Sequence, residues 1–82
     1  MNAENKYTTR VVKSQGLLYI FEILKNEGLI RKEDILSELN INDLSFWRYI
    51  QEIKAFIYNF NLPYELKYDR KSAVYRLIDT NL

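Results

Sequence analysis

The chain has 82 residues, of which 48% are hydrophobic and only three are glycine or proline, a composition typical of one globular domain and not of a disordered chain. The sequence lacks cysteine and histidine, which excludes disulfides, thiol chemistry and the common zinc sites and removes the most frequent general base, so neither an enzyme nor a bound cofactor is expected. The net charge of +1 gives no overall basic excess that would by itself indicate a nucleic-acid-binding protein.

The charges are nevertheless unevenly distributed along the chain. Five of the eleven acidic residues fall between Glu22 and Glu38, whereas the stretch from Lys67 to Arg76 holds four basic residues and one acid. A near-neutral protein can therefore present one basic face. The alternative is that these charges are ordinary solvated surface groups.

The N-terminal residues 1–9 are polar and are expected to form a flexible tail, and residues 10–82 are expected to form the domain. The first ten residues, MNAENKYTTR, lack the apolar centre of a secretory signal. No apolar run reaches the roughly 20 residues of a membrane span. We therefore expect a cytoplasmic protein with no membrane partner, associated with the nucleoid if it binds DNA.

Apolar residues at helical spacing predict three helices, over residues 13–27, 32–39 and 43–60. Gly28 is the expected C-cap of the first helix, and Asn40 is expected to end the second in the left-handed conformation that asparagine tolerates. Asn42 is the expected N-cap of the third helix, and Pro63 enforces its end.

The third helix carries an apolar stripe that sets the direction of the core, formed by Phe46, Ile50, Ile53, Ile57 and Phe60. Phe56 and the tyrosines that follow the helix are also expected in the core. No four-stranded sheet is predicted that would present the seven tyrosines to nucleobases.

Two β-prone runs follow Pro63, over residues 64–68 and 73–78, and the basic turn between them predicts a β-hairpin. The element order is helix, helix, tight turn, helix, hairpin. This order predicts an α+β, mostly α, fold: a winged helix-turn-helix of three helices followed by a β-hairpin wing.

Two stretches resemble DeoR-type regulators and the domains that precede WYL modules, over about residues 16–78. LNINDLSFWRYIQEI (39–53) is similar to the Leu-Gly-Val-Ser turn of that family and the helix after it. LPYELKYDRKSAVYRL (62–77) is similar to the family wing, Leu-Pro-Ile-x-Tyr-Asp-x-x-x-x-Gly-Tyr-x-Leu. The resemblance implies double-stranded DNA binding and transcriptional regulation.

The family positions map onto single residues of this chain. Arg48 falls on the arginine that commonly faces DNA in the family. Asn40 replaces the turn glycine, Leu44 the first arginine of the helix, Tyr49 an acid and Val74 a wing glycine. The residues that match the turn, the helix and the wing are Leu39, Ile41, Asn42, Phe46, Ile50, Leu62, Pro63, Tyr68, Asp69, Tyr75 and Leu77.

The exposed side of the third helix suits the major groove, where arginine can pair with guanine and glutamine with adenine. The wing is expected to contact phosphates, with Arg10 and Lys13 adding contacts from the other side. The predicted DNA-binding residues are Leu44, Ser45, Trp47, Arg48, Gln51, Lys54, Lys67, Arg70, Lys71, Arg10 and Lys13.

Each central residue has a structural alternative. Trp47 could cover the rim of the core. Arg48 could be a surface arginine paired with Glu52, four residues on.

The function has alternatives too. The main one is a winged-helix protein-protein interaction module, such as an anti-repressor or an adaptor, without direct DNA reading. A replication or plasmid-maintenance factor with the same fold is another. The possible partners are double-stranded DNA, a regulatory protein and a second copy of the chain, bound through Tyr19, Ile23 and the apolar turn 56–60.

Overall fold

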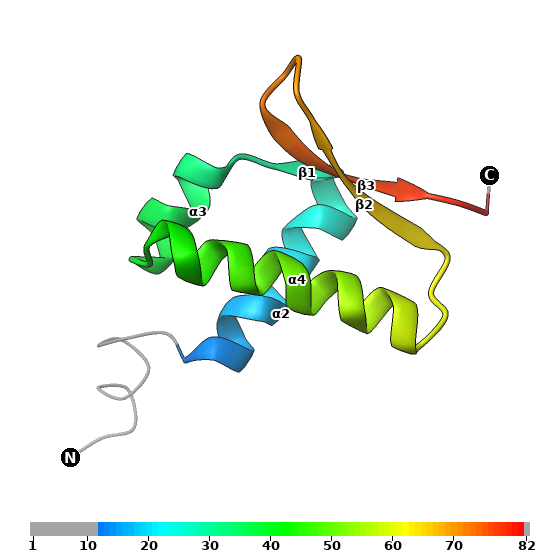
Figure 1. Cartoon of the computed structure of the whole chain (residues 1–82), viewed down its shortest axis with the longest axis horizontal. Coiled ribbons are helices and arrows are strands. Elements are labelled where there is room, and N and C mark those ends of the chain that lie inside the picture. The colour runs from blue at the N-terminus through cyan, green and yellow to red at the C-terminus, as the bar shows by residue number, and fades with distance from the viewer. Residues whose placement is uncertain (1–11, 82) are drawn as a thin grey trace.

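The structure, a computed structural model, describes residues 12–81 and contains in that range three helices and one three-stranded antiparallel sheet (Figure 1). The elements in chain order are α2 (Lys13–Glu27), β1 (Leu29–Ile30), α3 (Lys32–Leu39), α4 (Asp43–Asn59), β2 (Tyr64–Asp69) and β3 (Val74–Asp79). The expected α+β, mostly helical class is confirmed. In the described range no helix is long and apolar enough to cross a membrane.

The helix ends follow from local sequence. Gly28 and Asn40 both adopt the left-handed conformation, with φ of 86° and 55°, and their backbone N–H groups donate to Leu24 and Leu36. Asn42 caps α4, because its side-chain oxygen accepts a hydrogen bond from the backbone N–H of Ser45 at 2.9 Å. These three predictions are confirmed, and only two residues, Ile41 and Asn42, separate Asn40 from α4.

The sheet has the strand order β1-β3-β2. The hairpin β2–β3 has the expected position. Strand β2 is one residue longer than predicted and β3 is shifted by one residue, and the pair Asp69↔Val74 is the last before the turn. Strand β1 is not among the predicted elements. Ile30 pairs with Tyr75 on β3, and a two-residue strand is too short to show the period of two that marks strands in a sequence.

The core lies between α2, α3, α4 and the sheet. Its centre is the buried side of α4, where Phe46 is 1% exposed. The buried apolar side chains are Ile20, Leu24, Ile30, Ile35, Leu39, Phe46, Tyr49, Ile50, Ile53, Ile57, Leu66 and Val74. Tyr64 and Tyr75 are partly buried against this cluster, as predicted.

Three aromatic residues predicted in the core are exposed instead. Phe56 is 42% exposed, Phe60 68% and Tyr68 51%. Phe60 lies at the C-cap of α4, beyond the last turn that the other elements cover. Tyr68 lies next to the end of β2, where the hairpin projects past the body of the molecule (Figure 1).

A glycine notch sets how closely α2 approaches α4. Gly16 is buried on α2 against the ring of Tyr49 on α4, and a Cβ at Gly16 would lie 2.8 Å from Cε2 of Tyr49. Tyr49 is itself 8% exposed, so its ring has little room to move. The two helices can pack at this distance only because position 16 has no side chain.

We expect Gly16→Ala to lower the free energy of unfolding by about 1 kcal/mol. The steric cost of overpacking, about 1–3 kcal/mol, exceeds the gain in helix propensity of up to about 1 kcal/mol. Urea unfolding followed by circular dichroism measures the change. Gln15→Ala, at the exposed neighbouring position, is the control and should change stability by less than about 0.5 kcal/mol. A Gly16→Ala variant that is more stable than the parent protein would contradict the conclusion that α2 and α4 pack too closely at Gly16 for a side chain.

Candidate nucleic-acid interface

The outer side of α4 presents a continuous row of side chains to solvent. Successive residues of a helix turn by about 100°, so the buried positions place Leu44, Arg48 and Gln51 on the opposite side. All three are exposed, as are Trp47 and Lys54 on the adjoining flank. The structure thus brings together the residues predicted on this helix.

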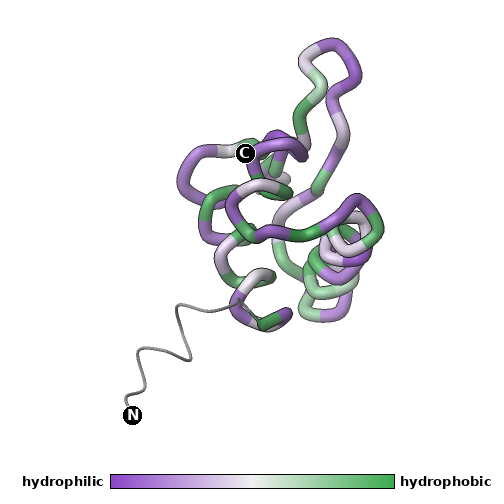
Figure 2. The backbone as a smooth tube through the Cα atoms, turned by 90° about the vertical axis from the view of Figure 1, so that its left-hand side faces the viewer, coloured by the Kyte–Doolittle hydropathy of each residue, from purple (hydrophilic) through white to green (hydrophobic). Residues whose placement is uncertain are grey.

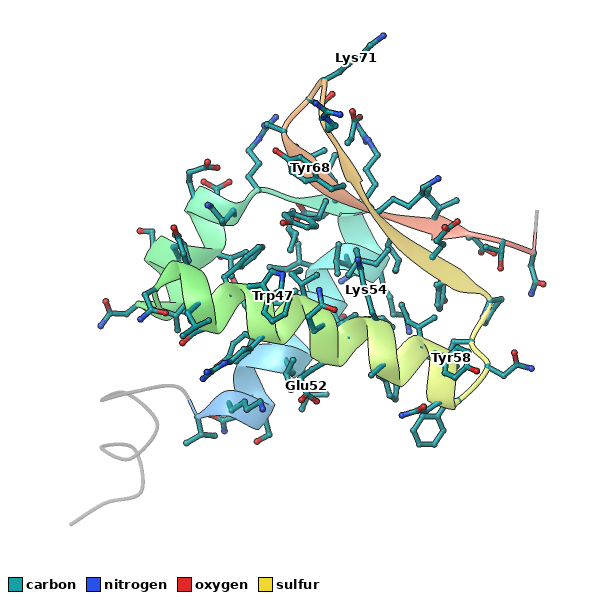
Figure 3. All side chains as sticks on the ribbon, viewed as in Figure 1. Trp47, Glu52, Lys54, Tyr58, Tyr68 and Lys71 are labelled. Carbon is teal, nitrogen blue, oxygen red and sulfur yellow. The ribbon has the colours of Figure 1, made fainter. Side chains whose placement is uncertain are left out.

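Neither of the two structural alternatives for this row of side chains occurs in the structure. Trp47 is 57% exposed and does not close the rim of the core. Glu52 pairs with Lys13, at 3.6 Å, on the flank of α4 that lies away from the hairpin (Figure 3). Within residues 12–81 Arg48 forms no ion pair, so its guanidinium is available to a ligand.

The β2–β3 hairpin projects from the body, and its tip is mostly hydrophilic (Figure 2). Asp69 organises the turn, since its Oδ1 accepts hydrogen bonds from the backbone N–H groups of Lys71 (3.1 Å) and Ser72 (3.3 Å). Its Oδ2 accepts a hydrogen bond from Nε of Arg76 at 3.0 Å, which is also an ion pair. Because Asp69 is engaged by Arg76, the exposed Arg70 and Lys71 dominate the charge of the tip.

Two contacts hold the hairpin against the helices. Nη1 of Arg31, at the N-terminus of α3, donates a hydrogen bond to the backbone carbonyl of Ser72 at 3.3 Å. On the other face, the ring of Phe46 contacts Tyr75 at 5.3 Å between centroids, and Tyr75 contacts Tyr68 at 4.9 Å. The hairpin is therefore fixed relative to the outer side of α4.

The remaining predicted residues lie elsewhere. Lys67 is exposed, but side chains alternate along a strand and place it on the opposite face of β2 from Tyr68. Lys13 is engaged by Glu52, so its predicted phosphate contact would require breaking that ion pair. Ser45 is half-buried, with its backbone N–H bonded to Asn42. Arg10 lies outside the described residues.

Two exposed aromatic residues on this side of the molecule are not among the predicted site residues: Tyr58, which is 84% exposed, and Tyr68. A signal for Tyr58 was available, since it follows Trp47 by eleven residues and Lys54 by four and so shares their flank. Arg31 gave no signal, because its contact with Ser72 spans 41 residues of sequence.

A second surface, between α2 and α4, is apolar. A groove of about 390 Å³ is lined by Leu17, Leu18, Phe21, Ile53 and Phe56, with Ser14 and Glu52 at its edge. Phe56 contacts both Phe21 (5.6 Å) and the exposed Phe60 (5.2 Å). Leu18 is 70% exposed.

The residues predicted for a symmetric contact are divided between two places. Ile23 is partly buried and packs against the core. The hydroxyl of Tyr19 donates a 2.7 Å hydrogen bond to Oε1 of Glu38, which raises the pKa of the tyrosine. Both line a hollow that is bordered by α3, whereas Phe56 lines the apolar groove between α2 and α4.

The fold and this surface define a small α+β domain with an exposed helix side next to a basic hairpin. Comparisons of the chain with protein-family models, with curated proteins and with solved structures find no match. The function proposed below therefore rests on the geometry and chemistry of the described residues and on the resemblance of the two sequence stretches.

The hairpin turn should depend on pH through Asp69. The hydrogen bond from Arg76 holds the pKa of Asp69 below its ordinary value of 3.8, so the carboxylate stabilises the turn above that pH and loses its effect as the pH falls through the lowered pKa. We expect the amide chemical shifts of Lys71 and Ser72 to report this titration by NMR. Arg76→Met should move the midpoint upward, whereas Arg70→Met, which removes a cation that is not bonded to Asp69, should not. An unchanged midpoint in Arg76→Met would contradict the assignment.

Proposed function

We propose that this protein is a winged helix-turn-helix protein that binds double-stranded DNA in a sequence-specific manner and regulates transcription. In this proposal α3, the turn at Asn40 and α4 form the helix-turn-helix, and the β2–β3 hairpin is the wing. The observation that carries the proposal is the outer side of α4, where Arg48 and Gln51 are exposed beside a basic hairpin tip. The resemblance to DeoR-type regulators supports the same interpretation.

In the proposed complex, α4 enters the major groove by its N-terminal half. Arg48 offers two parallel N–H donors suited to O6 and N7 of guanine, and Gln51 offers a donor and an acceptor suited to adenine. Trp47, on the adjoining flank, would lie against a thymine methyl or the sugar-phosphate backbone. Leu44 and Ser45, in the first turn, lie at the end of α4 that reaches deepest.

The wing would contact phosphates beside the groove. Arg70 and Lys71 are both exposed at the tip, and Lys71 points away from the body (Figure 3). The backbone of the turn is ordered by Asp69 and Arg31, so these side chains start from a fixed position. Lys54, on α4, adds a cation on the side nearest the hairpin.

Mutations in the two parts of the interface should differ in effect. Arg48→Ala should weaken binding to the preferred duplex by about 1–3 kcal/mol and relax the preference at one base pair. The double variant Arg70→Ala/Lys71→Ala should weaken binding to all duplexes and flatten the salt dependence, because about two fewer counterions are released. Fluorescence polarisation with selected and random duplexes at two salt concentrations separates these effects.

Lys25→Ala is the matched control, since it removes one positive charge from an exposed position on α2. It should bind like the parent protein. If Arg48→Ala and the double wing variant also bind duplex DNA like the parent, the DNA-binding proposal fails.

The apolar groove between α2 and α4 favours a second candidate function, a protein-protein interaction module. Its lining is almost entirely hydrocarbon, and Leu18, Phe56 and Phe60 together expose an apolar patch. Contiguous apolar patches on soluble proteins commonly mark contacts with other proteins. A second copy of the chain is the partner that would also suit DNA binding, because dimers read two half-sites about 34–36 Å apart.

We expect the parent protein to sediment as a dimer at high concentration. Leu18→Lys should shift it to a monomer, because the new charge would be buried in the contact without a partner. Gln15→Lys adds the same charge at an exposed position of α2 that does not line the groove, and it should remain dimeric. A parent protein that stays monomeric with and without DNA would contradict dimerisation.

A further inference from the structure

The flank of α4 that faces the hairpin carries an aromatic row that duplex reading does not require. Trp47 (57% exposed), Lys54 and Tyr58 (84% exposed) lie on one side of the helix, as Figure 3 shows. At about 1.5 Å of rise per residue, Tyr58 lies about 16 Å along the helix from Trp47, with Lys54 between the two rings. Tyr68 (51% exposed) lies across from them on the hairpin.

Of the three rings, only that of Tyr68 packs on another aromatic ring of residues 12–81, that of Tyr75. Within the described residues, neither Trp47 nor Tyr58 contacts another aromatic ring, and the hydroxyls of Tyr58 and Tyr68 form no hydrogen bond with another side chain. The other exposed apolar patch, around Leu18 and Phe60, contains only hydrocarbon side chains. The aromatic row instead combines amphipathic rings with a cation.

A hollow next to the row adds polar groups. It lies between the C-terminal half of α4 and β2, has a volume of about 450 Å³ and is bordered by Lys54, Tyr58, Asn61 and Tyr64. The ammonium of Lys54 suits a phosphate, and the amide of Asn61 suits the edge of a base. Glu65 also borders the hollow, so among the residues that line it the positive charge comes from Lys54 alone.

We infer that Trp47, Lys54, Tyr58 and Tyr68 bind the unpaired bases of a single DNA strand that leaves the duplex. The inference rests on the proposed function, since it extends the same α4 and hairpin surface. Bases inside a duplex are stacked on each other, and only unpaired bases offer their faces to aromatic side chains. When the N-terminal half of α4 is at the bases, Tyr58, about 16 Å along α4 from Trp47, lies at the end of the helix that is farther from these contacts.

Lys54 fits this ligand because of its place between the rings. Single-stranded binding sites combine stacking rings with cations that follow the backbone. A strand that crosses from Trp47 to Tyr58 would carry its phosphates past Lys54. Tyr68 is in tilted contact with Tyr75, which meets Phe46 edge-on, and these contacts support Tyr68 for a base that approaches from the hairpin side.

The test compares three DNA ligands by fluorescence polarisation: a blunt mixed-sequence duplex, the same duplex with a ten-thymidine tail on either strand end, and a thymidine 20-mer. We expect one of the tails to raise the affinity of the parent protein about tenfold over the blunt duplex, the effect of stacking one or two bases. Tyr58→Ala should remove this increment and leave binding to the blunt duplex unchanged. Tyr58→Phe keeps the ring and should retain the increment.

Phe60→Ala is the matched control, because it removes another exposed ring (68%) at the same end of α4 but outside the row. It should leave the increment intact. Trp47 is the only tryptophan of the chain, so its fluorescence gives a second readout. The thymidine 20-mer should quench it in the parent protein, as stacking on a base does.

The outcomes distinguish the inference from the function on which it rests. If the blunt duplex binds and neither tail adds affinity, or if Tyr58→Ala retains the increment, the inference is wrong and the proposed function stands. If the blunt duplex does not bind but the thymidine 20-mer binds and depends on Tyr58, the inference stands and duplex reading is wrong. If no DNA binds, both are wrong.

Discussion

The burial of one side of α4 is the constraint on which the rest of the molecule depends. Five residues of this helix are buried, and α2, α3 and β2 all contact it. The side chains of one helix keep fixed directions relative to one another. When Phe46, Ile50 and Ile53 face the core, Arg48 and Gln51 must therefore face solvent. A substitution that rotated α4 would therefore move the whole candidate interface, even if it touched none of its exposed residues.

The hairpin is coupled to the same helix through Phe46. Its ring is fully buried in the core and also contacts Tyr75 on β3, which contacts Tyr68 on β2. Arg31 ties the other side of the hairpin to the start of α3. Helix and hairpin are thus joined by side-chain contacts, and contacts that hold the hairpin in place before a ligand bridges the two lower the entropic cost of association.

Local signals allowed the sequence to predict the helices well. Gly28, Asn40 and Asn42 define helix ends through backbone conformation and a side-chain cap, which depend on only a few neighbouring residues. Burial was predicted less well, because the helical period shows which side of α4 faces inward but not how far the covering elements extend. Phe60 follows the period and is nevertheless exposed, since none of the elements in residues 12–81 covers it at the end of α4.

Long-range pairs could not be predicted for a related reason. Tyr49 is buried because Gly16, on another helix, leaves space for its ring. Lys13 was assigned to DNA from its charge alone, but folding places Glu52 within 3.6 Å of it. In both residues the partner lies more than thirty positions away, and no local pattern records it.

The near-neutral charge of the chain limits the electrostatic part of the proposed DNA binding. Three acids on the exposed surface of α3, Glu33, Asp34 and Glu38, would repel a phosphate backbone, so the duplex is favoured only on the α4 and hairpin side. Three cations on that side, Lys54, Arg70 and Lys71, are proposed for phosphates, and three phosphate contacts give a slope of log K against log salt of only about −2.7. Such a contact is weak at physiological salt unless another interaction adds to it.

Stacking of bases on aromatic rings does not depend on releasing counterions, so exposed rings such as Tyr58 would contribute affinity where charge is scarce. The structure matches this requirement. Polar aromatic residues lie on the basic side of the molecule, where stacking would add to the few charge contacts, and exposed hydrocarbon side chains gather on the α2 side.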